Sequence, residues 1–275
     1  MAAGKRIVLI TGANTGLGFE IVKALYASSH PYEILLGTRT LSNGEKARQT
    51  LHSEVSSSPG SSNVTVVQAD VSSDSSLEQL VKDVESKHGR LDCLINNAGA
   101  NFDQDIAKGT YSLREGMNKS WDVNITGTHI LTTLAMPLLL KSDDPRLIFM
   151  TSGTSSLHET ERLDGPMFGR LNAAPAKGWP KAQEVNPVTV YRSTKAGLNM
   201  LMRQWERILR EDAVKIWAIS PGFLVTGLGG LGEEALRKMG AKEPHVGGEF
   251  VRDVVEGKRD HDVGKIIRSD MIQPY

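Results

Sequence analysis

A short apolar run that leads directly into a glycine-rich loop constrains the fold of this chain more than any other feature. Residues Arg6 to Ile10 are apolar almost throughout, as a buried parallel strand should be. The loop that follows reads TGANTGLG, and helical spacing of apolar residues begins there. Gly12 permits a tight turn, Gly16 lets the backbone approach a ligand, and Gly18 allows close packing of the helix. Because the first N–H groups of a helix attract anions, this unit predicts a site for the phosphates of a dinucleotide.

The rest of the chain alternates between short apolar runs and amphipathic segments. Further strands are expected at residues 34–37, 64–68, 91–95, 147–151, 214–220 and 265–268. Helices are expected at residues 16–28, 43–55, 75–88, 121–140 and 190–211, the third of them capped by Ser73 or Asp74. Alternating strands and helices form parallel sheets through right-handed crossovers. We therefore predict one α/β domain over residues 1–275: a Rossmann-type, doubly wound sheet of seven parallel strands with helices on both faces.

Charge and composition argue against several kinds of partner. Lys+Arg and Asp+Glu both number 32, so the balanced charge gives no reason to expect binding to nucleic acid or to an anionic membrane. The longest apolar stretch, residues 130–140, is too short to cross a bilayer, and the apolar run near the start is too short for a signal peptide. Cys93 is the only cysteine, so no intrachain disulfide and no cysteine cluster for a metal is expected. We expect a cytoplasmic protein without a metal site.

A tyrosine and a lysine lie four residues apart in the run YRSTK, at Tyr191 and Lys195. That spacing places them on one face of the helix expected at residues 190–211. An ammonium group beside a phenol favours the phenolate, and so lowers the pKa of a tyrosine from its ordinary value near ~10. A phenol tuned in this way exchanges protons readily. With the dinucleotide loop, the pair predicts hydride transfer coupled to proton transfer.

Four motifs, in this order, resemble those of the short-chain dehydrogenase/reductase family. They are the TGxxxGxG spacing of the first loop, NNAG at residues 96–99, the Tyr-x-x-x-Lys pair, and Pro-Gly at residues 221–222. Each stands after an expected strand or on an expected helix, as in the family. The resemblance extends from about residue 5 to about residue 268. It implies the same doubly wound fold and a nicotinamide cofactor.

The resemblance also implies catalytic roles for four residues. Tyr191 would be the general acid/base, and Lys195 would lower its pKa and hold the ribose hydroxyls of the nicotinamide half. Ser152, at the end of the fifth strand, would hydrogen-bond the substrate carbonyl. Three neighbouring residues also carry hydroxyls, so this choice depends on the strand end. Asn124 would hold a water that links the lysine to solvent, or it would serve packing alone.

The implied cofactor site uses loops after several strands. Asp70 would contact the adenine ring, or serve only as a turn residue, and Asn97 would line the crevice. Pro221, Gly222 and Thr226 would cover the nicotinamide. The full expected set is Gly12, Asn14, Thr15, Gly16, Leu17, Gly18, Thr38, Arg39, Asp70, Val71, Asn97, Ala98, Gly99, Tyr191, Lys195, Pro221, Gly222, Leu224 and Thr226.

The end of the second strand predicts which dinucleotide binds. Enzymes that use NAD place an acidic residue there, but this chain has Thr38 and Arg39. The planar guanidinium suits a 2′-phosphate, and the pair resembles that of NADPH-preferring carbonyl reductases of the family. An ordinary surface arginine is the alternative. Many NADPH users also carry a basic residue in the glycine loop, where this chain has Asn14 and Thr15. We predict NADPH/NADP+ as cofactor.

Two segments are expected on the substrate side. Ser152 and Tyr191 are 39 positions apart, against roughly a dozen in compact members, so residues of about 153–189 form an insertion. Similar insertions shape the substrate entrance and can block the helices used for oligomers; a mere surface excursion is the alternative. Residues of about 223–242 are glycine-rich and stand where the family has a flexible substrate loop. A homodimer is the expected assembly.

The resemblance thus implies an NADPH-dependent oxidoreductase that reduces a ketone or aldehyde, a small carbonyl compound, to an alcohol. One alternative is a specialised biosynthetic enzyme of the same fold that carries out C=C reduction, dehydration or epimerisation. Another is a sensor that holds NADPH without turnover. Such sensors usually lack the tyrosine or the lysine, and both are present here.

Overall fold

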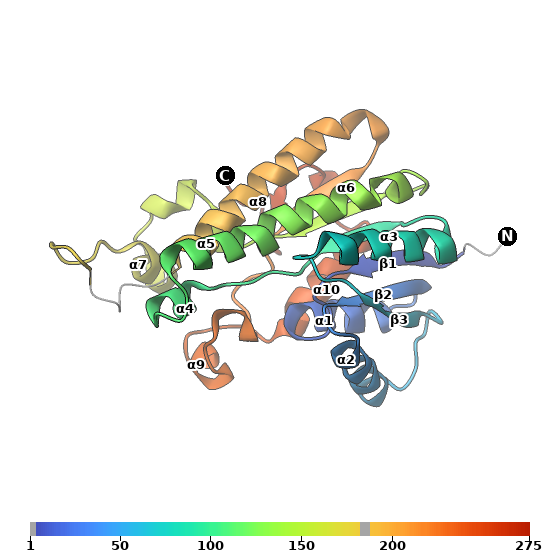
Figure 1. Ribbon diagram of the computed structural model, residues 1–275, viewed down its shortest axis with the longest axis horizontal. Helices are drawn as coiled ribbons and strands as arrows, with labels where there is room; N and C mark the ends of the chain where they lie inside the picture. The colour runs from blue at the N-terminus through green and yellow to red at the C-terminus, as the bar shows by residue number, and fades with distance from the viewer. Residues whose placement is uncertain (1–3, 182–187) are drawn as a thin grey trace.

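The computed structural model describes residues 4–181 and 188–275 (Figure 1). Within these ranges, seven strands form one parallel sheet in the order β3-β2-β1-β4-β5-β6-β7. The strands are β1 (Arg6–Ile10), β2 (Tyr32–Thr38), β3 (Asn63–Gln68), β4 (Cys93–Asn96), β5 (Arg146–Met150), β6 (Lys215–Ile219) and β7 (Ile266–Ile267). The order reverses between β1 and β4, which is the doubly wound Rossmann arrangement. The predicted fold class is confirmed.

Helices cover both faces of the sheet (Figure 1). One face carries α1 (Gly16–Tyr26), α2 (Leu41–Glu54) and α10 (Pro244–Val255), and the other carries α3 (Asp74–His88), α6 (Gly127–Leu139) and α8 (Thr189–Ile208). Shorter helices are α4 (Asp103–Ala107), α5 (Leu113–Trp121), α7 (Gly165–Asn172) and α9 (Glu233–Lys238). No helix in the described ranges combines the length and apolarity that a bilayer span requires.

The central strands are buried on both sides. In β1, Val8 and Ile10 pack toward α1 and α10, whereas Ile7 and Leu9 pack toward α3 and α6. Side chains alternate across a strand, so a strand between two helical layers must be apolar at every position. This is why the strands were recognisable as continuous apolar runs.

The helix expected to begin at Trp121 begins earlier. Ser112 and Glu115 form a capping box at the start of α5: the Ser112 hydroxyl accepts from the Glu115 N–H, and the Glu115 carboxylate accepts from the Ser112 N–H. The helix then passes through a π-helical turn, Asp122–Thr126, and continues as α6. Apolar spacing alone placed the start too late because the first turns of α5 are polar and partly exposed.

The packing of α10 against α1 was not anticipated from the sequence, where no helix was expected at residues 244–255. It depends on a close approach at Gly248, where an added Cβ atom would lie 2.5 Å from the Glu20 carbonyl oxygen of α1. Only a residue without a side chain allows the two helices to approach this closely.

We predict that Gly248→Ala lowers the free energy of unfolding by about 1–2 kcal/mol. Alanine gains up to about 1 kcal/mol of helix propensity, but overpacking against backbone costs about 1–3 kcal/mol. Denaturant unfolding would measure the change. Gly229→Ala is the control, because no atom lies within 4 Å of its added Cβ in the described structure. Equal stabilities of the two variants would contradict the prediction.

Candidate active site

Most of the expected site residues follow the carboxyl ends of six strands, β1 to β6, which meet at one edge of the sheet. At the reversal point, the loops after β1 and β4 are joined through Thr11 and Asn97. The Thr11 hydroxyl accepts from the N–H groups of Asn97 (3.1 Å) and Ala98 (2.9 Å). The Asn97 side chain donates from Nδ2 to the carbonyls of Thr11 (2.8 Å) and Gly12 (3.1 Å). Asn97 therefore holds the two loops together.

The glycine loop has the geometry that phosphate binding requires. Gly12 and Gly16 have φ of +61° and +55°, in the left-handed region. At Gly18 a Cβ atom would lie 2.3 Å from the Gly12 oxygen. In the described structure, the Thr15 cap of α1 makes no side-chain hydrogen bond, and no acidic residue stands in the first turn. The first N–H groups of α1 and the positive end of its dipole are thus available to an anion.

The end of β2 is joined to the glycine loop and is followed by a positively charged residue. The Thr38 hydroxyl donates to Asn14 Oδ1 over 3.1 Å and so joins β2 to the glycine loop. Arg39 follows directly and is exposed. An exposed arginine directly after Thr38, which bonds the glycine loop, suits a 2′-phosphate on the ribose of a dinucleotide.

Asp70 stabilises a turn in this structure through hydrogen bonds to its carboxylate. Its Oδ1 accepts from the N–H (3.0 Å) and the hydroxyl (2.7 Å) of Ser72, as the alternative from the sequence supposed. The adjacent Val71 carbonyl lies against α6, where a Cβ at Gly127 would be only 1.7 Å from its oxygen. The turn role and a contact with adenine are compatible, and the latter stays a prediction.

The segment after β6 packs against α1 and α10. A Cβ at Gly247 would lie 2.8 Å from both the Leu17 and the Leu224 Cδ1 atoms, and 3.4 Å from Pro221. Thr226 lies beside the glycine loop, 3.6 Å from the Cβ position of Gly16. The fold therefore brings the predicted residues after β6 close to the predicted residues of the glycine loop and α1. Leu17 and Leu224 also pack near Gly247 of α10.

Ser152 is distinguished from its hydroxyl neighbours by its contacts. Thr151 donates to Asn199 Oδ1 (2.6 Å), Ser155 donates to the Ser152 carbonyl (2.6 Å), and both side chains are buried. Ser152 Oγ is half-buried, lies 2.9 Å from Thr154 Oγ1, and contacts the phenol of Tyr191. Ser152 is thus the hydroxyl at the strand end that contacts Tyr191, and its catalytic role stays a prediction.

Burial dominates the electrostatics of the Tyr–Lys pair. It raises the pKa of Tyr191 to about 12, and the contact with the Ser152 hydroxyl opposes the rise only in part. Burial also lowers the pKa of Lys195 to about 8. The Lys195 ammonium lies 5.7 Å from the centre of the Tyr191 ring and donates to the Met150 carbonyl over 2.8 Å. The expected lowering of the tyrosine pKa by the lysine was therefore wrong for this arrangement, because burial raises the pKa and the group that opposes the rise is the Ser152 hydroxyl.

Asn124 lies in the π-helical turn between α5 and α6, a kind of irregularity that often marks functional sites. Its Oδ1 accepts from the Ala100 N–H (2.8 Å), and its Nδ2 donates to the Ala100 carbonyl (2.9 Å) and the Thr194 hydroxyl (2.9 Å). A Cβ at Gly99 would lie 3.2 Å from the Asn124 oxygen and 3.4 Å from the Lys195 ammonium. The two side chains thus border the same small space, and the water relay stays a prediction.

Asp103 was missed from the sequence. Its carboxylate is buried and accepts from the N–H groups of Val190 (2.9 Å) and Tyr191 (2.8 Å), so it caps the start of α8. Burial raises its pKa, and the two N–H bonds oppose that rise. No local pattern could have revealed it, since its partners are 87 and 88 positions away.

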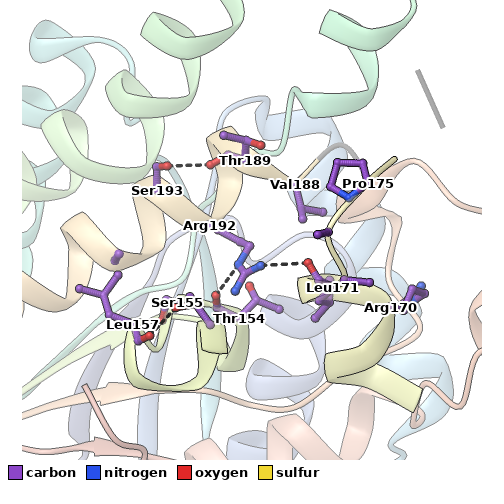
Figure 2. A pocket seen from close by; sticks show the side chains of 14 residues that line it. Thr154, Ser155, Leu157, Arg170, Leu171, Pro175, Val188, Thr189, Arg192 and Ser193 are labelled. Atoms are coloured by element: carbon purple, nitrogen blue, oxygen red, sulfur yellow. Dashed lines mark hydrogen bonds between the residues drawn. The ribbon is translucent and has the colours of Figure 1, made fainter. Parts of the chain in front are cut away.

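The insertion borders a cavity of about 630 Å³ beside α8 (Figure 2). Thr154, Leu157 and Leu171 come from the insertion, and Arg192 and Ser193 come from α8. Arg192 ties the two parts together: it donates to the Thr154 carbonyl (2.9 Å) and to Asn172 Oδ1 at the end of α7 (3.1 Å). Thr154 and Arg192, which line the cavity, are close in the chain to Ser152 and Tyr191, but these two residues do not line it. Residues 182–187 of the expected insertion lie outside the described residues.

Comparisons with known proteins agree with this geometry. The family pattern described as short chain dehydrogenase matches residues 6–162. The short-chain dehydrogenase/reductase eupG of Phoma sp is 44% identical over 100% of this chain and 99% of its own, and tropE of Talaromyces stipitatus is 44% identical over 98% of each. Carbonyl reductase [NADPH] 1 of Sus scrofa is 27% identical over 89% of this chain and 87% of its own.

Solved structures show the same fold. The crystal structure of an NADPH-bound carbonyl reductase from chicken fatty liver superposes with a TM-score of 0.75 at 22% identity, covering 99% of this chain and 100% of the other. The sequence match to more than half of the chain, together with relatives at 44% identity along its whole length, decides the classification. The chain belongs to the short-chain dehydrogenase/reductase family.

Proposed function

We propose that this protein is an NADPH-dependent oxidoreductase that reduces a ketone or an aldehyde to an alcohol, with Tyr191 as general acid. One observation carries the proposal: the side chains of Tyr191, Ser152 and Lys195 converge at the sheet edge that also carries the glycine loop. A protonated phenol beside a second hydroxyl and an ammonium group is suited to protonating an oxygen that becomes negatively charged.

The residues around the glycine loop fit NADPH. The available N–H groups of α1 suit its pyrophosphate, and the exposed Arg39 suits its 2′-phosphate. Lys195 would hold the ribose hydroxyls of the nicotinamide half, and the segment 221–226 would cover the nicotinamide. The pig enzyme is named for NADPH and the chicken structure is described as NADPH-bound, which supports the same choice here.

When bound, NADPH would supply the hydride. With a pKa near 12, the Tyr191 phenol is protonated at neutral pH, so it can give its proton to the carbonyl oxygen as that oxygen gains charge. The Ser152 hydroxyl would donate a hydrogen bond to the same oxygen. With a pKa near 8, Lys195 is mostly charged at neutral pH, so its ammonium would stabilise the phenolate and would return a proton to it through the space that it shares with Asn124.

The substrate would approach between the insertion and the segment 223–242. That segment carries a 3-10 turn at Gly227–Gly229 and the helix α9, and it is closed by a bond from the Val225 N–H to the Lys242 carbonyl (2.9 Å). Leu228 and Leu231 are exposed on it and would give an apolar wall. The insertion lies along the start of α8. The assembly that we propose is a homodimer.

We expect Tyr191→Phe to lower kcat by about 10²- to 10⁴-fold, the usual contribution of a general acid. NADPH affinity should change little, because only the hydroxyl is removed. The assay is NADPH oxidation against a panel of aromatic ketones, aldehydes, quinones and bulky cyclic diketones, with affinity measured separately by fluorescence. Near-native turnover of this variant would refute the role of the tyrosine.

We expect Arg39→Asp to weaken NADPH binding by about 10- to 100-fold, because a charge-assisted pair is replaced by repulsion of the 2′-phosphate. NADH binding should weaken less or improve. Arg48→Asp on the outer part of α2 is a matched control for charge, and it should leave the ratio of the two affinities unchanged. Full NADPH affinity of the Arg39 variant would rule out its role.

We expect kcat/KM for NADPH, which reports groups of the free enzyme, to fall about tenfold per pH unit above about pH 8. The cause is loss of the Lys195 proton, since burial lowers its pKa to about 8. Lys195→Arg keeps its charge over this range, so its profile should lack this decline whatever its absolute rate. A native profile that stays flat to pH 10 would contradict the assignment.

A further inference from the structure

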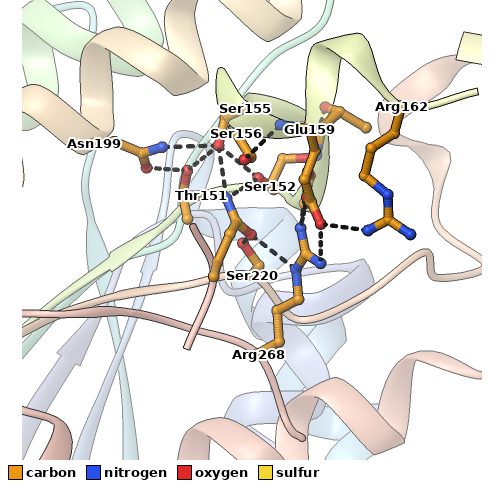
Figure 3. Close-up of polar contacts among 12 residues, drawn as sticks. Thr151, Ser152, Ser155, Ser156, Glu159, Arg162, Asn199, Ser220 and Arg268 are labelled. Carbon is orange, nitrogen blue, oxygen red and sulfur yellow. Dashed lines mark hydrogen bonds and ion pairs between the residues drawn. The ribbon is translucent and has the colours of Figure 1, made fainter. Parts of the chain in front are cut away.

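A cluster of polar side chains donates hydrogen bonds to the main chain at Ser152 and Gly153 (Figure 3). The Ser152 carbonyl accepts from the Ser155 N–H (3.1 Å), the Ser155 hydroxyl (2.6 Å) and Gln273 Nε2 (3.3 Å). The next carbonyl, of Gly153, accepts from Arg268 Nη2 (3.2 Å). Gln273 and Arg268 follow β7 and are 121 and 115 positions from their partners. Two donors distant in the sequence therefore fix the turn that carries the serine.

The orientation of the Gln273 amide is determined by its neighbours. Gln273 is only 1% exposed. Its Oε1 accepts from the Ser220 hydroxyl (2.6 Å) and from Arg268 Nε (3.1 Å), and the guanidinium can only donate. A flipped amide would set its own NH₂ group against Arg268 Nε and would place its oxygen against the Ser152 carbonyl. Nε2 must therefore point at Ser152.

Arg268 is fixed in turn by the insertion. Its guanidinium binds both carboxylate oxygens of Glu159, from Nη1 (3.0 Å) and from Nη2 (Figure 3). Glu159 is 3% exposed and lies in the 3-10 turn His158–Glu161 of the insertion. A bidentate pair between a half-buried guanidinium and a buried carboxylate has one favourable geometry. The remaining N–H groups of Arg268 are thereby aimed at Gly153 and Gln273.

We propose that Gln273 and Arg268 are positioning residues for the reaction, holding the Ser152–Gly153 turn so that the Ser152 hydroxyl meets the substrate oxygen. The inference rests on the proposed function, since it needs Ser152 to act on the substrate. Gln273 bonds the main chain of Ser152, so it would affect the reaction rate by fixing the position of the serine hydroxyl. Through Glu159, the insertion contributes to the same positioning.

Gln273→Glu tests the proposal most directly. The substitution keeps the size of the side chain and its acceptor toward Arg268, but it replaces the donor that faces the Ser152 carbonyl with an oxygen. Arg268 beside it keeps the new carboxylate ionised. We expect kcat to fall about 10- to 100-fold, because a small displacement of a catalytic group has an effect of this order. The Kd for NADPH should stay within about twofold of the native value.

The matched control is Gln204→Glu on α8. Gln204 is exposed, and its Oε1 likewise accepts from an arginine, Arg207 Nε, over 3.1 Å. We expect this variant to keep the native kcat. Rates are measured as NADPH oxidation with the best carbonyl compound of the panel, and folding is checked by the thermal unfolding transition.

Repeating Gln273→Glu in a Ser152→Ala background separates positioning from a general structural effect. If Gln273 acts through the serine hydroxyl, the second substitution causes no further loss of kcat there. Equal losses in both backgrounds, or an unchanged kcat in the native background, would overturn the proposal. Near-native turnover of Ser152→Ala alone would instead refute the role of the serine in the proposed function.

Arg268→Lys is the second variant, for use if Gln273→Glu does not fold. A lysine keeps the charge opposite Glu159 but lacks the fork that reaches Gly153 and Gln273 at the same time. We expect about tenfold lower kcat, again only where Ser152 is present. A native kcat in this variant would overturn the positioning role of Arg268.

Discussion

The hydrogen bonds between Thr11 and Asn97 fix the separation of the loops after β1 and β4, and the geometry of the site depends on that contact. At this reversal point the crossovers diverge to opposite faces of the sheet, which leaves a crevice for a ligand. The close approach of α1 to this contact requires Gly18, where a Cβ would lie 2.5 Å from Asn97 Nδ2. One contact thus fixes the glycine loop relative to the loop after β4, on either side of the reversal point.

The catalytic end depends on two buried charges near the start of α8. Asp103 caps the helix through two N–H groups, and Lys195 is stabilised by the Met150 carbonyl. Burial disfavours both ionised forms, so the pKa of Asp103 rises and that of Lys195 falls to about 8. The same burial raises the pKa of Tyr191. Enclosure therefore keeps the phenol protonated, the state that the proposed reduction would need, while the lysine stays charged at neutral pH.

Most of the fold and the identity of the candidate catalytic residues could be predicted, because each depends on local patterns. Buried parallel strands are apolar at every position, and Tyr191 and Lys195 carry a recognisable spacing. What could not be predicted depends on contacts distant in the sequence. Asp103 and Gln273 have ordinary local surroundings, and only the fold brings them to their partners. The prediction that the pKa of Tyr191 is lowered was wrong for the same reason, since desolvation is a property of the packed site.

The insertion is joined to the catalytic groups on two sides, which makes it more than a wall for the substrate. Arg192, which follows Tyr191 in α8, donates hydrogen bonds to the insertion. Glu159 of the insertion pairs with Arg268, which bonds the carbonyl of the residue after Ser152. These are charged groups with fixed partners, so they resist independent movement better than an apolar contact would. A displacement of the insertion by a bulky substrate would therefore be transmitted to Ser152. Under the proposed function, substrate fit and the placement of the Ser152 hydroxyl would be coupled through the same polar contacts.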